Sequence, residues 1–194
     1  MAEKMLSIPL IKQEKSNWCY AAVTQMIIKY YNPGIEIHQC DIVRDITRDS
    51  DNNDKQDPYE YLAANKYIKD CFTKPNIPRK VIIEQIEGNN PILVLIGGHY
   101  TLLIGYSNKQ YKGDDDKTFF LDPLKDTPTI VSKAVTHVSV NYESKALDEV
   151  EPIRGYCILQ NPLGKGIKKS RKGIRKSRKG RKRDRKKYKK TIKL

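Results

Sequence analysis

Residues 92–106 read ILVLIGGHYTLLIGY, and this stretch decides the fold class of the chain. Residues 92–96 form a continuous apolar run of strand length, which is typical of a strand buried on both faces. The pair Gly97-Gly98 then favours a turn. Residues 99–106 form a second apolar run of strand length. The stretch therefore predicts two strands of an antiparallel sheet, joined by a short turn.

The sheet is expected to continue towards the C-terminus. Residues 107–117 read as a hydrophilic loop, and residues 118–122 as a third strand that Pro123 ends. Polar and apolar residues alternate over residues 134–140, and residues 155–159 are another apolar run. Both patterns predict further strands.

The chain before residue 92 is expected to be mainly helical. Apolar side chains recur at helical spacing after Ser16 or Asn17, either of which can cap a helix, and Asn32-Pro33-Gly34 ends it. Asp57-Pro58 is a typical start of another helix. The helices are expected at residues 16–31, 38–46, 57–72 and 79–87, with a solvated loop at residues 49–54. Helices first and an antiparallel sheet afterwards predict an α+β fold, with the N-terminal helical part packed on a C-terminal sheet.

The positive charge of the chain is concentrated near its C-terminus. The net charge is +14 over 194 residues, yet residues 165–194 hold 18 Lys and Arg against one acid. That leaves 19 basic and 22 acidic residues, a net charge of −3, in residues 1–164. Since the basic segment has almost no apolar residues, it is expected to be disordered on its own. We therefore expect one folded domain at 1–164 and a disordered polybasic tail at 165–194.

The cysteines indicate neither a metal site nor a disulfide framework. They lack C-x-x-C spacing, which argues against zinc, and reduced thiols in a cytosolic or nuclear setting are the expectation. The four are Cys19, Cys40, Cys71 and Cys157. Neither a secretory signal nor a transmembrane segment is expected, because no stretch has the required apolar length. We expect an intracellular protein, cytoplasmic or nuclear; delivery into a host cell or carriage in a virion is the alternative.

Cys19 falls in the first turn of the expected helix 16–31, which is a favourable place for a nucleophile. Cysteine attacks as the thiolate, and a free thiol with a pKa of about 8.5 is mostly protonated at neutral pH. The positive end of a helix dipole and an adjacent imidazolium both lower that pKa. Trp18 and Tyr20 would exclude water and help to shape a cleft. The alternative is a buried structural cysteine, because free cysteine is among the most buried residue types.

Three segments resemble, in the same order along the chain, motifs of the papain-like cysteine protease superfamily. Residues 13–22, QEKSNWCYAA, are similar to its nucleophile segment, in which a glutamine lies six residues before the cysteine. Residues 97–106, GGHYTLLIGY, resemble its histidine strand. Residues 119–123, FFLDP, resemble the next strand, which ends in the third catalytic residue. The nearest resemblance is to the compact branch similar to bacteriocin-processing peptidases and bacterial effector cysteine proteases; the CGSCW run of the lysosomal branch is missing.

The resemblance implies a papain-like fold and a Cys-His-Asp triad that needs no metal or cofactor. Cys19 would be the nucleophile, His99 its general base and later its general acid, and Asp122 the acceptor that orients the histidine. The side-chain amide of Gln13 and the backbone N–H of Cys19 would form the oxyanion hole. Antiparallel pairing of the strand that follows His99 with the strand that precedes Asp122 would bring both residues to the same end of a hairpin.

Each of these residues also has a structural interpretation. Gln13 can be a surface residue, Asp122 before a proline can be turn chemistry, and His99 after two glycines can lie at a turn edge. His38 and His137 are the other candidate bases. His38 follows the first helix too closely, and His137 lies too far along the chain to match the Gly-His pattern.

The leading hypothesis is a cysteine peptidase that hydrolyses peptide or isopeptide bonds of a protein or peptide substrate through an acyl-enzyme. The same residues support acyl transfer, as in transglutaminase-like and deubiquitinating enzymes. Another alternative is an inactive papain-like scaffold that serves as a nucleic-acid-associated binding or packaging protein. The tail 165–194 is expected to act as a nuclear signal or to bind nucleic acid through its phosphates. An anionic membrane surface, another polyanion, or no specific partner are its other interpretations.

Overall fold

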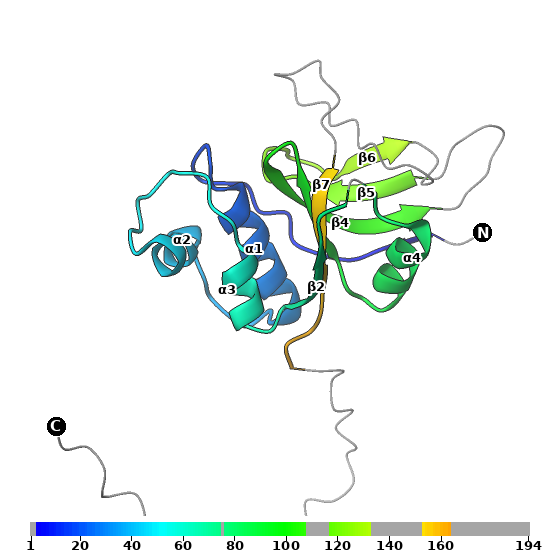
Figure 1. The fold of residues 1–194 in the computed structure, drawn as a ribbon, viewed down its shortest axis with the longest axis horizontal. Coiled ribbons are helices and arrows are strands. Elements are labelled where there is room, and N and C mark those ends of the chain that lie inside the picture. Colours follow the sequence, from blue (N-terminus) through cyan, green and yellow to red (C-terminus); the bar gives the residue numbers. More distant parts are fainter. Residues whose placement is uncertain (1–2, 75, 108–116, 133–152, 164–194) are drawn as a thin grey trace, which may run out of the picture. The chain divides into compact units, whose positions relative to one another are not determined.

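The computed structural model describes residues 3–74, 76–107, 117–132 and 153–163. Within them, the helices are α1 (Cys19–Tyr31), α2 (Gln39–Thr47), α3 (Tyr59–Ala64) and α4 (Arg79–Glu87). The helices α1, α2 and α3 lie together on one side of an antiparallel sheet, and α4 lies apart from these three, beside the sheet (Figure 1). Helices and strands are thus segregated, and the expected α+β fold with N-terminal helices packed on an antiparallel sheet is confirmed.

The sheet has seven strands in the described residues, and every neighbouring pair is antiparallel. They are β1 (Glu3–Met5), β2 (Ile68–Phe72), β3 (Ile92–Ile96), β4 (His99–Ser107), β5 (Lys117–Leu121), β6 (Thr129–Ser132) and β7 (Ile153–Leu159). The order is β2-β7-β3-β4-β5-β6, and β1 pairs with the end of β4. Gly105 suits this pairing because a Cβ there would lie 2.7 Å from the carbonyl oxygen of Lys4.

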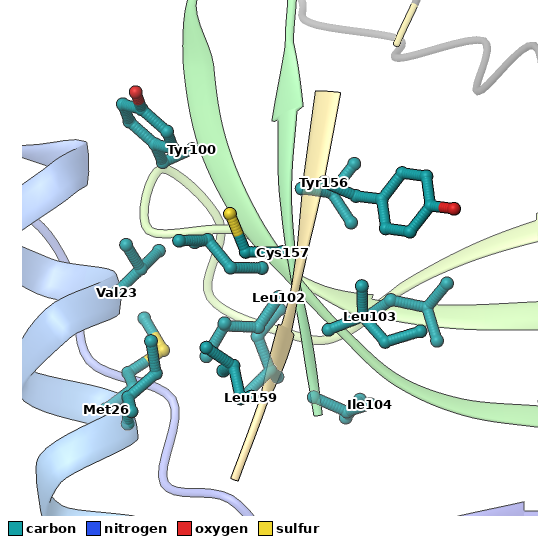
Figure 2. Packing of buried hydrophobic residues seen from close by; sticks show 14 of the residues in the cluster. Val23, Met26, Tyr100, Leu102, Leu103, Ile104, Tyr156, Cys157 and Leu159 are labelled. Carbon is teal, nitrogen blue, oxygen red and sulfur yellow. The ribbon is translucent and has the colours of Figure 1, made fainter. Parts of the chain in front are cut away.

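Helix α1 is the central helix, because its first ten residues are all buried. Val23 and Met26 point from α1 toward Leu102 of β4 and Leu159 of β7 (Figure 2). Truncating a core leucine of this kind to alanine typically costs about 2–5 kcal/mol. This packing therefore fixes α1, and the residue at its start, against the strand that carries the histidine.

The strands predicted from residues 92–122 are confirmed. β3 and β4 begin at the expected residues, and β5 is displaced by one residue from the expected 118–122. Gly97 and Gly98 form the turn with φ of 55° and 95°. Left-handed backbone at both positions of a two-residue hairpin turn is what glycine permits at low cost.

The helix expected at 57–72 is wrong in its second half. α3 ends at Ala64, the chain turns at Lys66 with a φ of 63°, and Ile68–Phe72 forms the edge strand β2. β2 pairs with β7, placing Ile68 opposite Leu159. Pairing with the distant strand β7 overrides the local helical pattern. The sequence also did not predict the short strands β1 and β6, which pair with β4 and β5.

The expectation that all four cysteines are reduced thiols is also wrong. Cys71 of β2 and Cys157 of β7 are directly opposite in the register and form a disulfide. Their separation of 86 residues in the sequence hides this juxtaposition, which only the β2–β7 pairing creates. Cys19 and Cys40 are free. Since disulfides persist mainly in oxidising compartments, the pair does not support the expected cytosolic setting.

Several predictions fall outside the described residues. These are the strand at 134–140, residues 108–116 of the loop predicted at 107–117, and the polybasic tail at 165–194. In the part of the chain that the structure describes, no helix combines the length and the apolar character needed to cross a bilayer.

Candidate active site

Cys19 is the first residue of α1, and its side chain is buried. In the first turn of a helix the backbone N–H groups lack partners within the helix, and the dipole favours a negative charge. The first turn of α1 contains no acidic residue that would oppose a thiolate. The position therefore favours the thiolate form of Cys19.

His99 and Asp122 lie at one end of the β4–β5 pair, as the hairpin argument predicts. His99 begins β4, Asp122 follows β5, and Leu102 of β4 is opposite Leu121 of β5. The Nε2 atom of His99 lies 2.7 Å from Oδ1 of Asp122. Asp122 is fully buried, and its Oδ1 also accepts a hydrogen bond from the backbone N–H of Leu124 at 2.9 Å. The turn after β5 thus fixes the carboxylate that binds the histidine.

The electrostatics of Cys19 and His99 favour an ion pair. Burial raises the pKa of the Cys19 thiol, but a hydrogen bond and the positive charge of His99 outweigh burial, so that this pKa is lowered. Backbone N–H groups of Tyr100 and Tyr20 act in the same direction. Burial lowers the pKa of His99, but hydrogen bonds with Asp122 and Cys19 raise it to about 9. Because Nε2 binds Asp122, Nδ1 is the ring nitrogen that remains for Cys19.

Gln13 lies beside the turn that carries Asp122, but its side-chain amide already donates hydrogen bonds within the protein. Its backbone N–H donates to the carbonyl oxygen of Pro123 at 3.1 Å, next to Asp122. Its Nε2 donates to the carbonyl oxygens of Lys15 (2.9 Å) and Ser16 (2.6 Å), in the turn before α1. Its Oε1 is buried and has no hydrogen-bond partner among the described residues. The structure brings Gln13 to the site with both amide hydrogens directed at that turn.

The loop at 49–54 also binds the turn before α1. The indole N–H of Trp18 donates to the carbonyl oxygen of Asn52 at 2.8 Å. Asn17 donates two hydrogen bonds to Asn53, from its backbone N–H to Oδ1 at 3.2 Å and from its side-chain amide to the carbonyl oxygen at 2.7 Å. The polar composition of this loop predicted exposure to solvent, but it carries no signal of which segment the loop binds.

Gln39 is another residue near the site that the sequence analysis does not identify. It is fully buried at the start of α2, where its side chain binds the backbone of Lys12 and Glu14, on either side of Gln13. A single glutamine in a polar segment has no spacing that identifies such a role, and only the folded structure reveals its partners.

The other candidate residues do not join this site. His38 is exposed immediately before α2, and the hydrogen bond of Cys19 is made with His99 instead. His137 lies outside the described residues. Among the residues that are described, no three His, Cys, Asp or Glu side chains are grouped so that they could hold a metal ion.

Comparison with known proteins gives one family. No curated protein matches the chain. The sequence model of the Peptidase_C39 like family matches residues 5–146, a segment that includes Gln13, Cys19, His99 and Asp122. This match covers most of the chain, and it confirms the resemblance drawn from the three motifs. The chain therefore belongs to the Peptidase_C39 like family, a branch of the papain-like cysteine peptidases.

Proposed function

We propose that this protein hydrolyses peptide or isopeptide bonds with Cys19 as nucleophile, His99 as general base and acid, and Asp122 as the residue that orients His99. The observation that carries the proposal is the hydrogen-bonded chain from Asp122 through His99 to Cys19. Membership in a cysteine peptidase family implies peptide substrates.

The reaction begins with the thiolate of Cys19 attacking the carbonyl carbon of the scissile bond. The S–C bond forms, and the carbonyl electron pair moves to oxygen. When the C–N bond breaks, the imidazolium of His99 gives its proton to the leaving amine. His99 then accepts a proton from a water molecule that attacks the thioester, and Cys19 is released. Asp122 keeps the ring oriented and stabilises its protonated form.

The oxyanion would be bound by the backbone N–H of Cys19 and the side-chain amide of Gln13. The first of these donors lies in a helix turn where N–H groups have no intrahelical partner. The second donates to two turn carbonyls in the free protein, so one of those hydrogen bonds would be exchanged for the oxyanion. Loss of one such donor typically reduces the rate by about 10²–10³-fold.

Alkylation of the native protein with iodoacetamide tests the triad. Cys40 is a built-in reference, because it is a free, partly exposed thiol, whereas Cys71 and Cys157 are joined. We expect Cys19 to be alkylated faster than Cys40 in spite of its burial, since its pKa is lowered. Peptide mapping by mass spectrometry measures both rates.

The matched variants for this test are His99→Ala and His38→Ala. Only His99→Ala should remove the preference for Cys19 and abolish cleavage of a peptide substrate. If Cys19 reacts no faster than Cys40 in the unaltered protein, the triad proposal is wrong. Adding an amine nucleophile separates hydrolysis from acyl transfer, because only a transferase forms the new amide in preference to the free acid.

We further propose that residues 165–194 hold the enzyme on a polyanion such as nucleic acid, as a unit separate from the domain at 1–164. The support is the charge of this segment, 18 basic residues against one acid. Neutralised phosphates release their counterions, which favours binding without sequence recognition.

A further inference from the structure

We infer that Gln39 is a positioning residue that holds Gln13 in place for oxyanion binding, and the inference rests on the role proposed above for Gln13. Nε2 of Gln39 donates to the carbonyl oxygen of Lys12 at 2.6 Å. Oε1 of Gln39 accepts from the backbone N–H of Glu14 at 3.0 Å. One side chain therefore binds the residue before Gln13 and the residue after it.

The backbone around Gln13 is held from two directions. Gln39 binds Lys12 and Glu14 from the side of α2, and the N–H of Gln13 itself binds Pro123 beyond β5. Three successive residues thus have a fixed backbone, although they belong to no helix or strand. A fixed backbone limits the positions that the Gln13 amide can reach when it exchanges a turn carbonyl for the oxyanion.

Gln25 of α1 orients the amide of Gln39. Its Oε1 lies 3.3 Å from Nε2 of Gln39, and its own Nε2 donates to the carbonyl oxygen of Ile37 at 2.6 Å. Gln25 is buried and lies on the same helix as Cys19. A chain of amides therefore connects the nucleophile helix to the segment that carries Gln13.

Packing alone does not account for a glutamine at position 39. Its side chain is fully buried, and an unpaired polar group in such a place costs about 1–3 kcal/mol. A methionine would fill a similar volume without that requirement. What distinguishes glutamine is the ability to donate to one backbone group and accept from another, and both partners here flank Gln13.

The test compares two reactions of Cys19 that need the thiolate equally but differ in the oxyanion. With p-nitrophenyl acetate, an S–C bond forms, negative charge develops on the carbonyl oxygen, and p-nitrophenolate leaves with the electron pair. With iodoacetamide, the thiolate displaces iodide and no oxyanion forms. The ratio of the acylation rate to the alkylation rate therefore reports the oxyanion hole, and it requires no knowledge of the natural substrate.

The variant Gln39→Met should lower this ratio by about tenfold to a hundredfold, the order expected when a catalytic group is misplaced by about 1 Å. The alkylation rate and its pH profile should stay as in the unaltered protein, because the hydrogen bonds of Gln39 are made with Lys12, Glu14 and Gln25 and not with the triad. Asn32→Ala is the matched control, since it removes an amide hydrogen bond to Tyr67 at the opposite end of α1. This control should not change the ratio.

A double variant separates positioning from a general structural effect. If Gln39 acts through Gln13, adding Gln39→Met to Gln13→Ala causes no further loss in the ratio. A further loss of the same size would overturn the inference. If Gln39→Met does not fold, Gln39→Glu serves instead. The glutamate keeps the acceptor for the N–H of Glu14 and loses the donor to the carbonyl oxygen of Lys12. If the ratio for Gln39→Glu equals that of the unaltered protein, the inference is also overturned.

The experiment also distinguishes this inference from the proposed function. If Gln13→Ala leaves the ratio unchanged, the oxyanion role of Gln13 is wrong, and the role of Gln39 falls with it. If Gln13→Ala lowers the ratio and Gln39→Met does not, the oxyanion role stands and only the positioning role of Gln39 is rejected.

Discussion

Asp122 illustrates how much of the site depends on one buried carboxylate. Its Oδ1 binds both Nε2 of His99 and the backbone N–H of Leu124, whereas Oδ2 is buried without a hydrogen-bond partner among the described residues. Hydrogen bonds between an imidazolium and a carboxylate are about twice as strong as neutral ones. Protonation of His99 therefore strengthens the hydrogen bond of the Asp122 carboxylate, of which only one oxygen has partners in the described part of the chain.

The pH dependence of cleavage follows from the same contacts. Activity should rise with pH as the Cys19 thiol ionises. Because the pKa of that thiol is lowered, this rise should occur at a lower pH than for an ordinary cysteine. It should fall above pH about 9, where His99 loses the proton that the leaving amine needs. In Asp122→Asn the hydrogen bond that raises the pKa of His99 is weakened, so the alkaline limb of kcat/KM should move to lower pH.

Asp126→Asn is the control for this prediction. Asp126 lies four residues after Asp122, but it is exposed and forms an ion pair with Lys12 at 2.5 Å. Surface pairs of this kind contribute little, so the control should leave the alkaline limb in place. An unchanged limb in Asp122→Asn itself would show that this carboxylate does not set the pKa of His99.

The residues of the site differ in how well sequence predicts them. Cys19, His99 and Asp122 are predictable, because each occupies a motif with a fixed relation to a helix start or a strand end. Gln13 is predictable in position, but the hydrogen bonds of its amide to the following turn are not. Gln39 is not predictable, because its partners are backbone atoms that approach it only after folding.

At the scale of helices and strands, local patterns locate most elements, and long-range pairing decides the remainder. α4 and β3 match their predicted bounds, since periodicity and turn residues agree over both segments. Residues 68–72 show the limit: their composition suits the end of a helix, yet β7 provides a partner that makes them a strand. The disulfide was missed for the same reason.

Removing the Cys71–Cys157 disulfide should lower the stability of the fold markedly. It closes a loop with a separation of 86 residues, and a chain-entropy model gives about 4–5 kcal/mol for a loop of that size. We expect the double variant Cys71→Ser with Cys157→Ala to lose about 2–5 kcal/mol of unfolding free energy in urea. Reduction of the unaltered protein with dithiothreitol should have a similar effect.

Cys40→Ala is the comparison for this measurement, because Cys40 is a free thiol that is partly exposed. It should change the unfolding free energy by much less than the double variant. If the two variants unfold at the same urea concentration, the disulfide does not stabilise the fold.

At the scale of the whole chain, charge and catalysis belong to different segments. The net charge of residues 1–164 is −3, and that of residues 165–194 is +17. The catalytic residues proposed here all lie in the first segment. The strong positive charge of the protein is therefore no guide to the surface around Cys19.

Deleting residues 165–194 should separate the two properties. The shortened chain should elute from a heparin column at much lower salt, because it lacks the groups that displace counterions. Its peptidase activity should be retained. The control is a chain whose tail has the same composition in scrambled order, and it should elute with the unaltered protein. If the shortened chain elutes at the salt concentration of the unaltered protein, the electrostatic proposal is wrong.

The position of Cys157 also has a mechanical consequence. Tension applied to the chain beyond Leu163 would enter the folded part through β7, which lies between β2 and β3 in the sheet. Peeling β7 from its C-terminal end would release Leu159 and Ile158 first and would then reach the covalent link to β2. While that link is intact, the strand cannot be drawn out of the sheet without β2. A pull on the tail would therefore be passed on to β2 once two residues of β7 had been released, and not directly to the strands that carry His99 and Asp122.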